Sequence, residues 1–148
     1  IESNLIYPSL PALIKLSEVL AVDLQIFFQS VDEVTEQIIF PETKAIDAQL
    51  DSLPREGLNA KLLIPRRPDS KIEPFLIEIP AGAKLASHFF FHKGQEIGYL
   101  LAGKLALQTR QGLHSAGAGD TICLFSEVPV SWKNPGPEPA KLLWIKVK

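Results

Sequence analysis

ASHFFFHKGQEIGYLLAG, residues 86–103, is the stretch that decides the fold of this chain. Its first half is predicted to be a strand, in which His88, Phe90 and His92 share one face because side chains alternate along a strand. A short polar turn follows, and a second strand returns from Glu96. The hairpin brings the carboxylate of Glu96 beside the histidine end of the first strand, so we expect His92 and Glu96 to face each other.

Short apolar runs separated by turn residues continue from residue 72 to the end of the chain. Glycine, proline and asparagine mark the turns between them. The predicted strands are Pro74–Ile79, Leu85–His92, Glu96–Leu101, Lys104–Arg110, Gly112–Ser115, Asp120–Phe125, Val128–Asn134 and Lys141–Lys146. Eight short strands at this spacing predict a mainly β fold, an antiparallel double-sheet barrel of the jelly-roll kind.

Two segments resemble the conserved motifs of the cupin superfamily, which has this fold. The first motif has the order His-x-His, three or four residues, Glu, six residues, Gly, and it matches His92, Glu96 and Gly103. The second motif matches residues 119–134, with its glycine and its asparagine in register. The resemblance implies a cupin barrel over residues 72–148.

The metal ligands of the cupin family are only half retained. The resemblance places the four ligands at Phe90, His92, Glu96 and Val130, and neither phenylalanine nor valine can ligate a metal. A catalytic zinc site uses three protein ligands, and a non-haem iron site uses two histidines and a carboxylate. We therefore expect no metal, no other cofactor and no catalytic residue, and we interpret the remaining polar pair as the floor of a small-molecule pocket. The predicted ligand-binding residues are His88, Phe90, His92, Glu96, Val130 and Trp132.

Several alternatives stay open for this pocket. His92 and Glu96 can equally form a hydrogen-bonded pair inside a cavity, with or without a weakly held metal ion. Trp132 is a candidate for core packing as well as for ligand contact. His88 lies on the order of 13 Å along the strand from His92, so it can join that residue only if a bulge shortens the strand.

Residues 1–29 are predicted to form two short helices, the first capped by Ser9 with Pro11 in its first turn, and the second capped by Asp23. With Tyr7-Pro8-Ser9-Leu10 and Phe27-Phe28, this segment resembles the end of a lambda-repressor-like (Xre-type) helix-turn-helix domain. The resemblance implies that the DNA-reading helices precede Ile1, and the absence of methionine indicates a chain that is not an unprocessed translation product. Residues 30–71 are predicted to be a connector with strands.

The composition of the chain argues against several classes of function. A formal net charge of -2 over 148 residues gives no nucleic-acid footprint for the whole chain. No apolar run approaches the roughly 18 residues of a membrane span, and no signal peptide is recognised, so a cytoplasmic location is expected. Cys123 lies in an apolar run and is expected to be a buried, inert thiol.

The order of helix-turn-helix tail, connector and cupin barrel implies the effector-sensing part of a bacterial transcriptional regulator. We expect a homodimer that binds a small-molecule effector, binds DNA through residues upstream of this chain, and is not an enzyme. The alternative is a cupin-fold metal-dependent enzyme, an isomerase or dioxygenase, although such enzymes need the histidines that Phe90 and Val130 replace. A third reading is a dimerisation module with a filled cavity.

Overall fold

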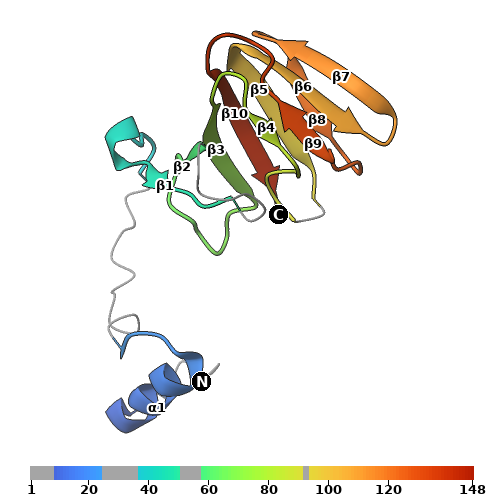
Figure 1. The fold of residues 1–148 in the computed structure, drawn as a ribbon. Coiled ribbons are helices and arrows are strands. Elements are labelled where there is room, and N and C mark those ends of the chain that lie inside the picture. Colours follow the sequence, from blue (N-terminus) through green and yellow to red (C-terminus); the bar gives the residue numbers. More distant parts are fainter. Residues whose placement is uncertain (1–8, 25–36, 51–57, 92–93) are drawn as a thin grey trace. The chain divides into compact units, whose positions relative to one another are not determined.

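A computed structural model of the chain describes residues 9–24, 37–50, 58–91 and 94–148. The chain divides into two compact units, residues 1–38 and residues 39–148. The first contains helix α1 (Leu10–Leu20), and the second contains the 3-10 helix η2 (Glu42–Lys44) and all the described strands (Figure 1). Each unit is a separate structural body.

Helix α1 begins where the sequence predicts. The backbone N–H of Ala12 donates to the Oγ of Ser9, the N-cap residue, and a proline occupies the first turn. Ala21 ends the helix in the left-handed conformation, with φ of 51°. The 11 residues of α1 fall well short of the length needed to cross a bilayer, and no other helix in the described ranges comes nearer to it. The predicted second helix from Asp23 lies mostly outside the described residues.

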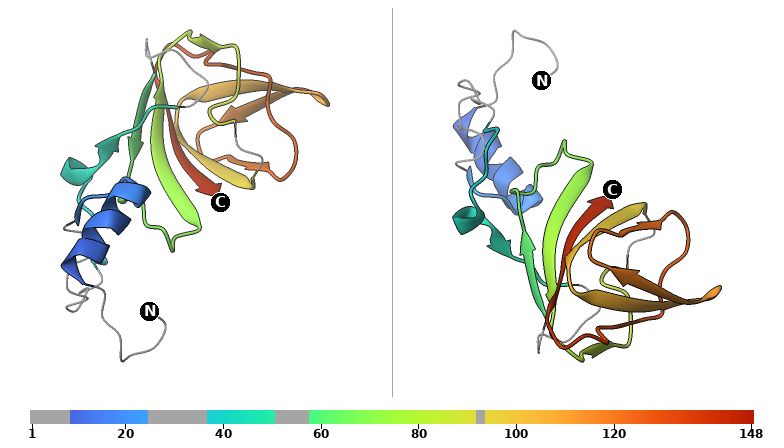
Figure 2. Two further views of the ribbon diagram at one scale, coloured as in Figure 1. Left: turned by 90° about the horizontal axis from the view of Figure 1, so that it is seen from below. Right: turned by 90° about the horizontal axis from the view of Figure 1, so that it is seen from above.

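The described residues of the second unit form two antiparallel sheets that pack face to face (Figures 1 and 2). The larger sheet has the strand order β1-β2-β3-β10-β5-β8, and the smaller has the order β4-β9-β6-β7. The strands are β1 (Ile46–Asp47), β2 (Asn59–Leu62), β3 (Ile72–Ile79), β4 (Lys84–Leu85), β5 (Glu96–Ala102), β6 (Lys104–Thr109), β7 (Gly112–Gly117), β8 (Thr121–Leu124), β9 (Ser131–Lys133) and β10 (Ala140–Val147). The predicted mainly β barrel is confirmed.

The compact unit begins earlier than the boundary that the sequence suggests at residue 72. Strand β2 pairs with β3 in the register Asn59 to Glu78, and β1 pairs with β2. These two strands extend the larger sheet, so much of the segment predicted as a connector belongs to the body of the barrel. Leu50, Ala60 and Leu62 join its hydrophobic core.

The prediction of a strand over Leu85–His92 is wrong. Only Lys84 and Leu85 form a strand, β4, and the chain beyond them is irregular. Phe89 and Phe90 are consecutive and both buried, which alternation along a strand does not allow, whereas Phe91 is 75% exposed. Burial of two successive rings requires the backbone to leave the extended conformation.

The expectation of a buried Cys123 is also wrong. Strand β8 alternates strictly, with Ile122 and Leu124 buried and Thr121 and Cys123 exposed. The thiol therefore lies on the outer side of an edge strand. An apolar run in the sequence concealed this alternation because cysteine itself counts as apolar.

Glycine and asparagine hold the turns of the barrel. Gly103 joins β5 to β6 with φ of +86°, and a Cβ there would lie 2.7 Å from the Cα of Ala140. Asn134 is fully buried, and its Nδ2 donates to the carbonyls of Ile79, Pro80 and Glu138. Its Oδ1 accepts the N–H of Gly136, so this one side chain ties two loops together.

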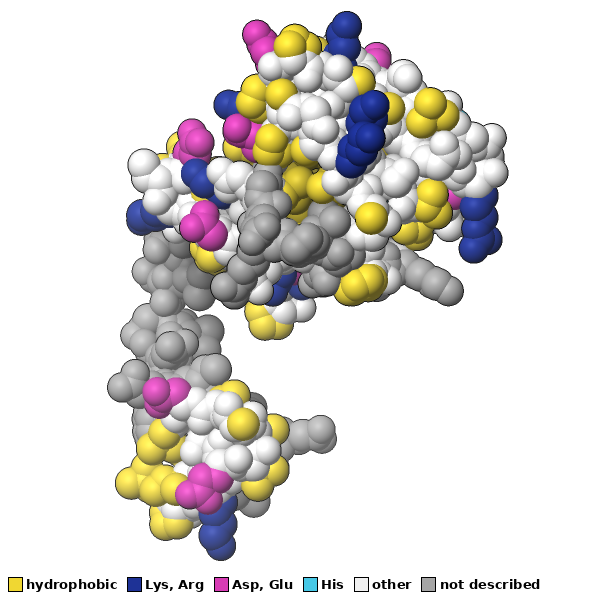
Figure 3. All heavy atoms as spheres, in the orientation of Figure 1, with side chains coloured by type: hydrophobic (Ala, Val, Ile, Leu, Met, Phe, Trp, Pro, Cys, Tyr) yellow, Lys and Arg dark blue, Asp and Glu magenta, His cyan; other side chains and the backbone are white. Residues whose placement is uncertain are grey.

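Outward-facing apolar side chains are visible on both units in Figure 3.

Candidate ligand site

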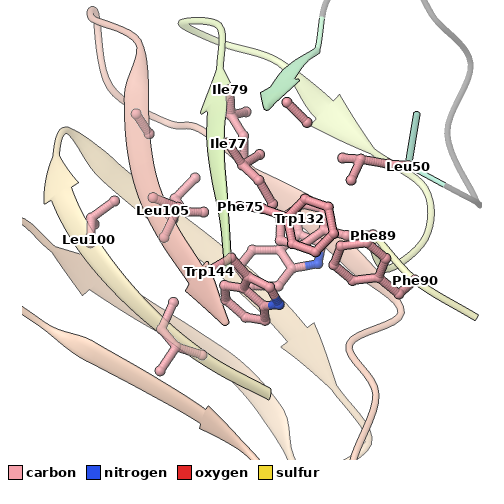
Figure 4. Close-up of a cluster of buried hydrophobic side chains, with 14 of the residues drawn as sticks. Leu50, Phe75, Ile77, Ile79, Phe89, Phe90, Leu100, Leu105, Trp132 and Trp144 are labelled. Carbon is pink, nitrogen blue, oxygen red and sulfur yellow. The ribbon is translucent and has the colours of Figure 1, made fainter. Parts of the chain in front are cut away.

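Aromatic side chains fill the interior of the barrel between the two sheets. Phe89 stacks on Trp132 with ring centroids 4.6 Å apart, and Trp132 meets Trp144 edge to face at 5.6 Å. Phe75 and Phe90 lie 5.0 Å apart beside them. Figure 4 shows these rings gathered together within the hydrophobic core. This part of the interior is occupied by protein.

A buried polar network lies within the aromatic cluster. The Nε2 of His88 is 2.9 Å from Oε2 of Glu96, and both side chains are only 2–3% exposed. The indole N–H of Trp132 donates to Nδ1 of His88 at 3.3 Å. The indole N–H of Trp144 donates to the same oxygen of Glu96 that His88 contacts. Two tryptophans thus enclose one histidine–carboxylate pair.

The partners assign the proton on the histidine ring. An indole nitrogen can only donate, so Nδ1 of His88 must carry a lone pair toward Trp132. The ring proton then sits on Nε2, from which it is donated to Glu96. In this arrangement His88 is a neutral imidazole and Oε2 of Glu96 accepts from two donors.

Local sequence creates the space for this network. Glu96 begins β5 facing inward, and Gly98 is the next inward position on the same strand. A Cβ on Gly98 would lie 2.2 Å from the Cε3 and Cζ3 atoms of Trp144. The missing side chain lets the indole ring lie flat over the strand, so that its N–H reaches Glu96.

The structure brings together four of the six predicted site residues. His88, Phe90, Glu96 and Trp132 are all buried and belong to one cluster. Most of their surroundings are packed side chains, and Glu96 also lines a cavity of about 960 Å3. The predicted partner of Glu96, His92, lies outside the described residues, and the partners that the structure shows for Glu96 are His88 and Trp144.

Val130 does not join this cluster. Its side chain is 52% exposed, and its backbone N–H donates to the carbonyl of Gln108 just before β9 begins. Pro129, which is fully buried, takes the inward position instead. The expectation placed Val130 on a regular strand, but β9 starts only at Ser131. Sequence reasoning also missed Trp144, for which the signal was a glycine inside a strand.

The described residues do not fit the metal site of the cupin motif. Phe90 and Val130 have no ligand atom, and Oε2 of Glu96 already accepts two hydrogen bonds. Within the described part of the chain, no three His, Cys, Asp or Glu side chains gather as a metal site requires. The visible chemistry of the cluster is hydrogen bonding between satisfied groups.

The chain is similar to a protein family model and to several solved structures. The cupin domain family model matches residues 75–146. No match to a curated protein was found. Solved structures do match. The cupin domain of an XRE family transcriptional regulator from Enterobacter cloacae is 16% identical, with a TM-score of 0.54, over 63% of this chain and 98% of that one.

Two other similar structures carry enzyme names. The polyketide cyclase RemF from Streptomyces resistomycificus is 16% identical, with a TM-score of 0.59, over 72% of this chain and 76% of that one. A sugar phosphate isomerase of the cupin superfamily from Silicibacter pomeroyi is 24% identical, with a TM-score of 0.50, over 62% of this chain and 60% of that one. The chain thus spans less than two thirds of that isomerase. The family match over residues 75–146 and the sheet topology agree, and the described strands of the second unit have the cupin fold.

Proposed function

We propose that this chain is the effector-sensing part of a bacterial DNA-binding transcriptional regulator, and that its barrel binds a small molecule without a metal. The observation that carries the proposal is the replacement of two cupin ligand positions by Phe90 and Val130 in a barrel whose scaffold is intact. Glu96, a third ligand position, already accepts two hydrogen bonds from protein donors. A cupin altered in this way retains a framework for binding but lacks the usual means of metal catalysis, so we infer that it is not an enzyme.

Helix α1 supports the assignment to a regulator. It resembles the end of an Xre-type domain, and one similar structure is the cupin domain of a regulator of that family. Leu10, Val19 and Leu20 on α1 are each more than half exposed. An exposed apolar helix is expected of a segment that packs against preceding helices of a DNA-binding domain. Acidic side chains on this unit (Figure 3) agree with DNA contacts made elsewhere, by residues that precede Ile1.

In this proposal the regulator is a cytoplasmic homodimer, because dimers match two-fold operators. The effector shifts the balance between two states, and it can do so only if it binds the DNA-competent and the incompetent state with different affinity.

The coding sequence that precedes Ile1 provides the first test. We expect it to encode about fifty residues of helix-turn-helix with basic and polar positions on its third helix, consistent with recognition helices of this class. The longer protein should retard DNA from its own promoter in a mobility-shift assay. An upstream sequence of another kind, or no DNA binding, would overturn the regulator proposal.

The second candidate is a metal-dependent cupin isomerase or dioxygenase. The buried histidine–carboxylate pair and the similarity to a cyclase and an isomerase favour it. Metal analysis of the purified protein separates the two functions. Near-stoichiometric iron, zinc or manganese, lost when Glu96 is replaced by Gln, would support the enzyme and contradict the sensor proposed above.

A further inference from the structure

A cavity lies away from the filled centre of the barrel. It has a volume of about 510 Å3 and is lined by β6, β7, β8 and the segment that follows β8. β7 and β8 are edge strands of different sheets, so this pocket occupies the open side of the sandwich. We call it the β7–β8 pocket. Its volume falls within the range of small-molecule sites, roughly 300–1,000 Å3.

The β7–β8 pocket has an apolar floor. Leu107, Ile122 and Leu124 are each at least nine-tenths buried and line it from both sheets. Phe125 is 67% exposed and also lines the pocket. These side chains offer burial to the apolar body of a small ligand.

Polar groups in the pocket have unused hydrogen-bonding capacity. The Nε2 of His114 is 3.1 Å from the buried Thr109 hydroxyl, which also accepts the N–H of Gln111. This contact fixes the imidazole, and its Nδ1 has no hydrogen-bond partner within the described ranges. Glu127 is half-buried and accepts the N–H of Gln111 through Oε1 at 3.3 Å. Its other oxygen has no such partner among the residues that the structure describes.

The charge of the lining is negative. Glu127 and Asp120 line the pocket, and no lysine or arginine is among the described lining residues. The Asp120 carboxylate accepts the N–H of Gly117 at 2.7 Å, which holds the turn before β8. Glu127 is therefore the better placed of the two to meet a ligand. Arg110, the nearest basic residue in sequence, lines an adjoining cavity, which Glu127 lines as well.

We propose that the β7–β8 pocket is the effector site of the barrel, and that it takes a small primary amine with an apolar body. The ammonium group would be held by Glu127, because hydrogen bonds between ionised partners are stronger than neutral ones. The apolar body would lie on Leu107, Ile122 and Leu124. A carboxylate of the same shape would face Glu127 and Asp120 with like charge and be rejected. The role of this ligand as an effector rests on the regulator function proposed above, whereas the site and its ligand class rest on the pocket.

Matched ligands test the site directly. The ¹⁵N-labelled chain is titrated with hexylamine and phenethylamine, and with hexanoate and phenylacetate, which keep similar apolar bodies and reverse the charge. We expect the amines to shift amide signals of β7 and residues 121–127, and the carboxylates to leave them in place. The proposal would be overturned if neither amine shifted the amide signals, if amines and carboxylates bound equally well, or if the shifts were centred on the aromatic cluster.

Variants locate the charge that decides affinity. Glu127→Gln keeps an acceptor for Gln111 but removes the charge, and should weaken amine binding about tenfold, which is about 1.4 kcal/mol. Glu138→Gln makes the same change at an exposed position outside the pocket and should leave affinity unaltered. Ser126→Trp, at an exposed lining position, should block the pocket if Glu127→Gln proves unstable. Unchanged affinity in folded Glu127→Gln or Ser126→Trp would contradict the assignment.

The two proposals can fail separately. Amine binding in the β7–β8 pocket with no DNA binding by the longer protein would retain the site and remove the regulator. DNA binding by the longer protein, with no amine binding at the pocket, would do the reverse.

Discussion

Gly98→Ala is the substitution that most directly tests how the buried network is built. The alanine Cβ would lie 2.2 Å from two ring carbons of Trp144, a separation that no real pair of carbons tolerates. The neighbouring atoms belong to a large ring in a fully buried site, so the strain cannot be relieved by a flexible chain end. Trp144 must shift, and its hydrogen bond to Glu96 is lost or weakened.

Three contributions set the change in the free energy of unfolding that Gly98→Ala should cause. Overpacking of a well-packed core costs about 1–3 kcal/mol. Loss of a hydrogen bond to a charged group adds about 1.5–3 kcal/mol, while restriction of the unfolded chain by alanine returns about 0.4–1 kcal/mol. We expect a net loss of about 3 kcal/mol in the free energy of unfolding. For a unit of this size the Tm should fall by about 12 °C.

Urea unfolding followed by tryptophan fluorescence is the appropriate assay, because the chain has 2 tryptophans, Trp132 and Trp144, and both lie at the network. Gly117→Ala is the matched control, since its Cβ would come no closer than 3.8 Å to Asp120 and its φ is ordinary. The control should stay within about 0.5 kcal/mol of the original chain. Equal stability of the two variants would refute the placement of Trp144 over Gly98.

Three further predictions concern buried polar groups and the thiol. Glu96→Leu leaves two buried N–H donors without an acceptor and should lower the free energy of unfolding by about 4 kcal/mol. Glu96→Gln retains an accepting oxygen and should lower it by only about 1 kcal/mol. Urea unfolding measures both changes. Asn134→Asp turns an amide that donates to three carbonyls into a carboxylate facing them, so it should cost about 4 kcal/mol. Asn59→Asp, at an exposed position at the start of β2, should cost under about 0.5 kcal/mol, and similar Tm values for the two variants would contradict this. Cys123 should react fully with a thiol reagent under native conditions, and reaction only after unfolding would contradict its exposure.

Sequence patterns predicted the barrel well because most of its strands obey strict alternation. Strand β3 buries every second residue from Glu73 to Ile79, and β10 does so from Ala140 to Trp144. The turn glycine Gly103 and the loop asparagine Asn134 also occupy positions that the cupin motifs anticipate. These features are local, so a single sequence contains the information needed to find them.

The candidate site was predicted less well, because its geometry depends on a departure from alternation. The pattern predicts that FFF at residues 89–91 is part of a strand, which puts His88 on the order of 13 Å from His92 along an extended chain. The irregular backbone buries Phe89 and Phe90 together and brings His88 within 2.9 Å of Glu96. No local rule predicts that a carboxylate will meet His88 when the backbone at Phe89 and Phe90 departs from a regular strand.

Trp144 could be anticipated only through Gly98, one strand away. The two residues are cross-strand partners in the β5–β10 pairing, which connects positions 46 residues apart in the sequence. A glycine inside a strand often marks the close approach of another group, but it does not identify that group. Long-range register is therefore the physical information that the pattern lacks.

The filled centre and the open side of the barrel separate stability from ligand binding. In a metal cupin one set of residues serves both, since the ligands that bind the metal also line the cavity. Here Glu96 accepts from indole and imidazole donors, while Glu127 lines the β7–β8 pocket with one oxygen unused among the described residues, although both carboxylates also line an adjoining cavity. Changes at Glu96 should accordingly alter unfolding free energy with little effect on amine affinity in the variants that remain folded, and Glu127→Gln should do the opposite. A loss of amine affinity in folded Glu96→Gln comparable to that in Glu127→Gln would mean that the two regions form one site, and that the aromatic cluster opens to receive the ligand.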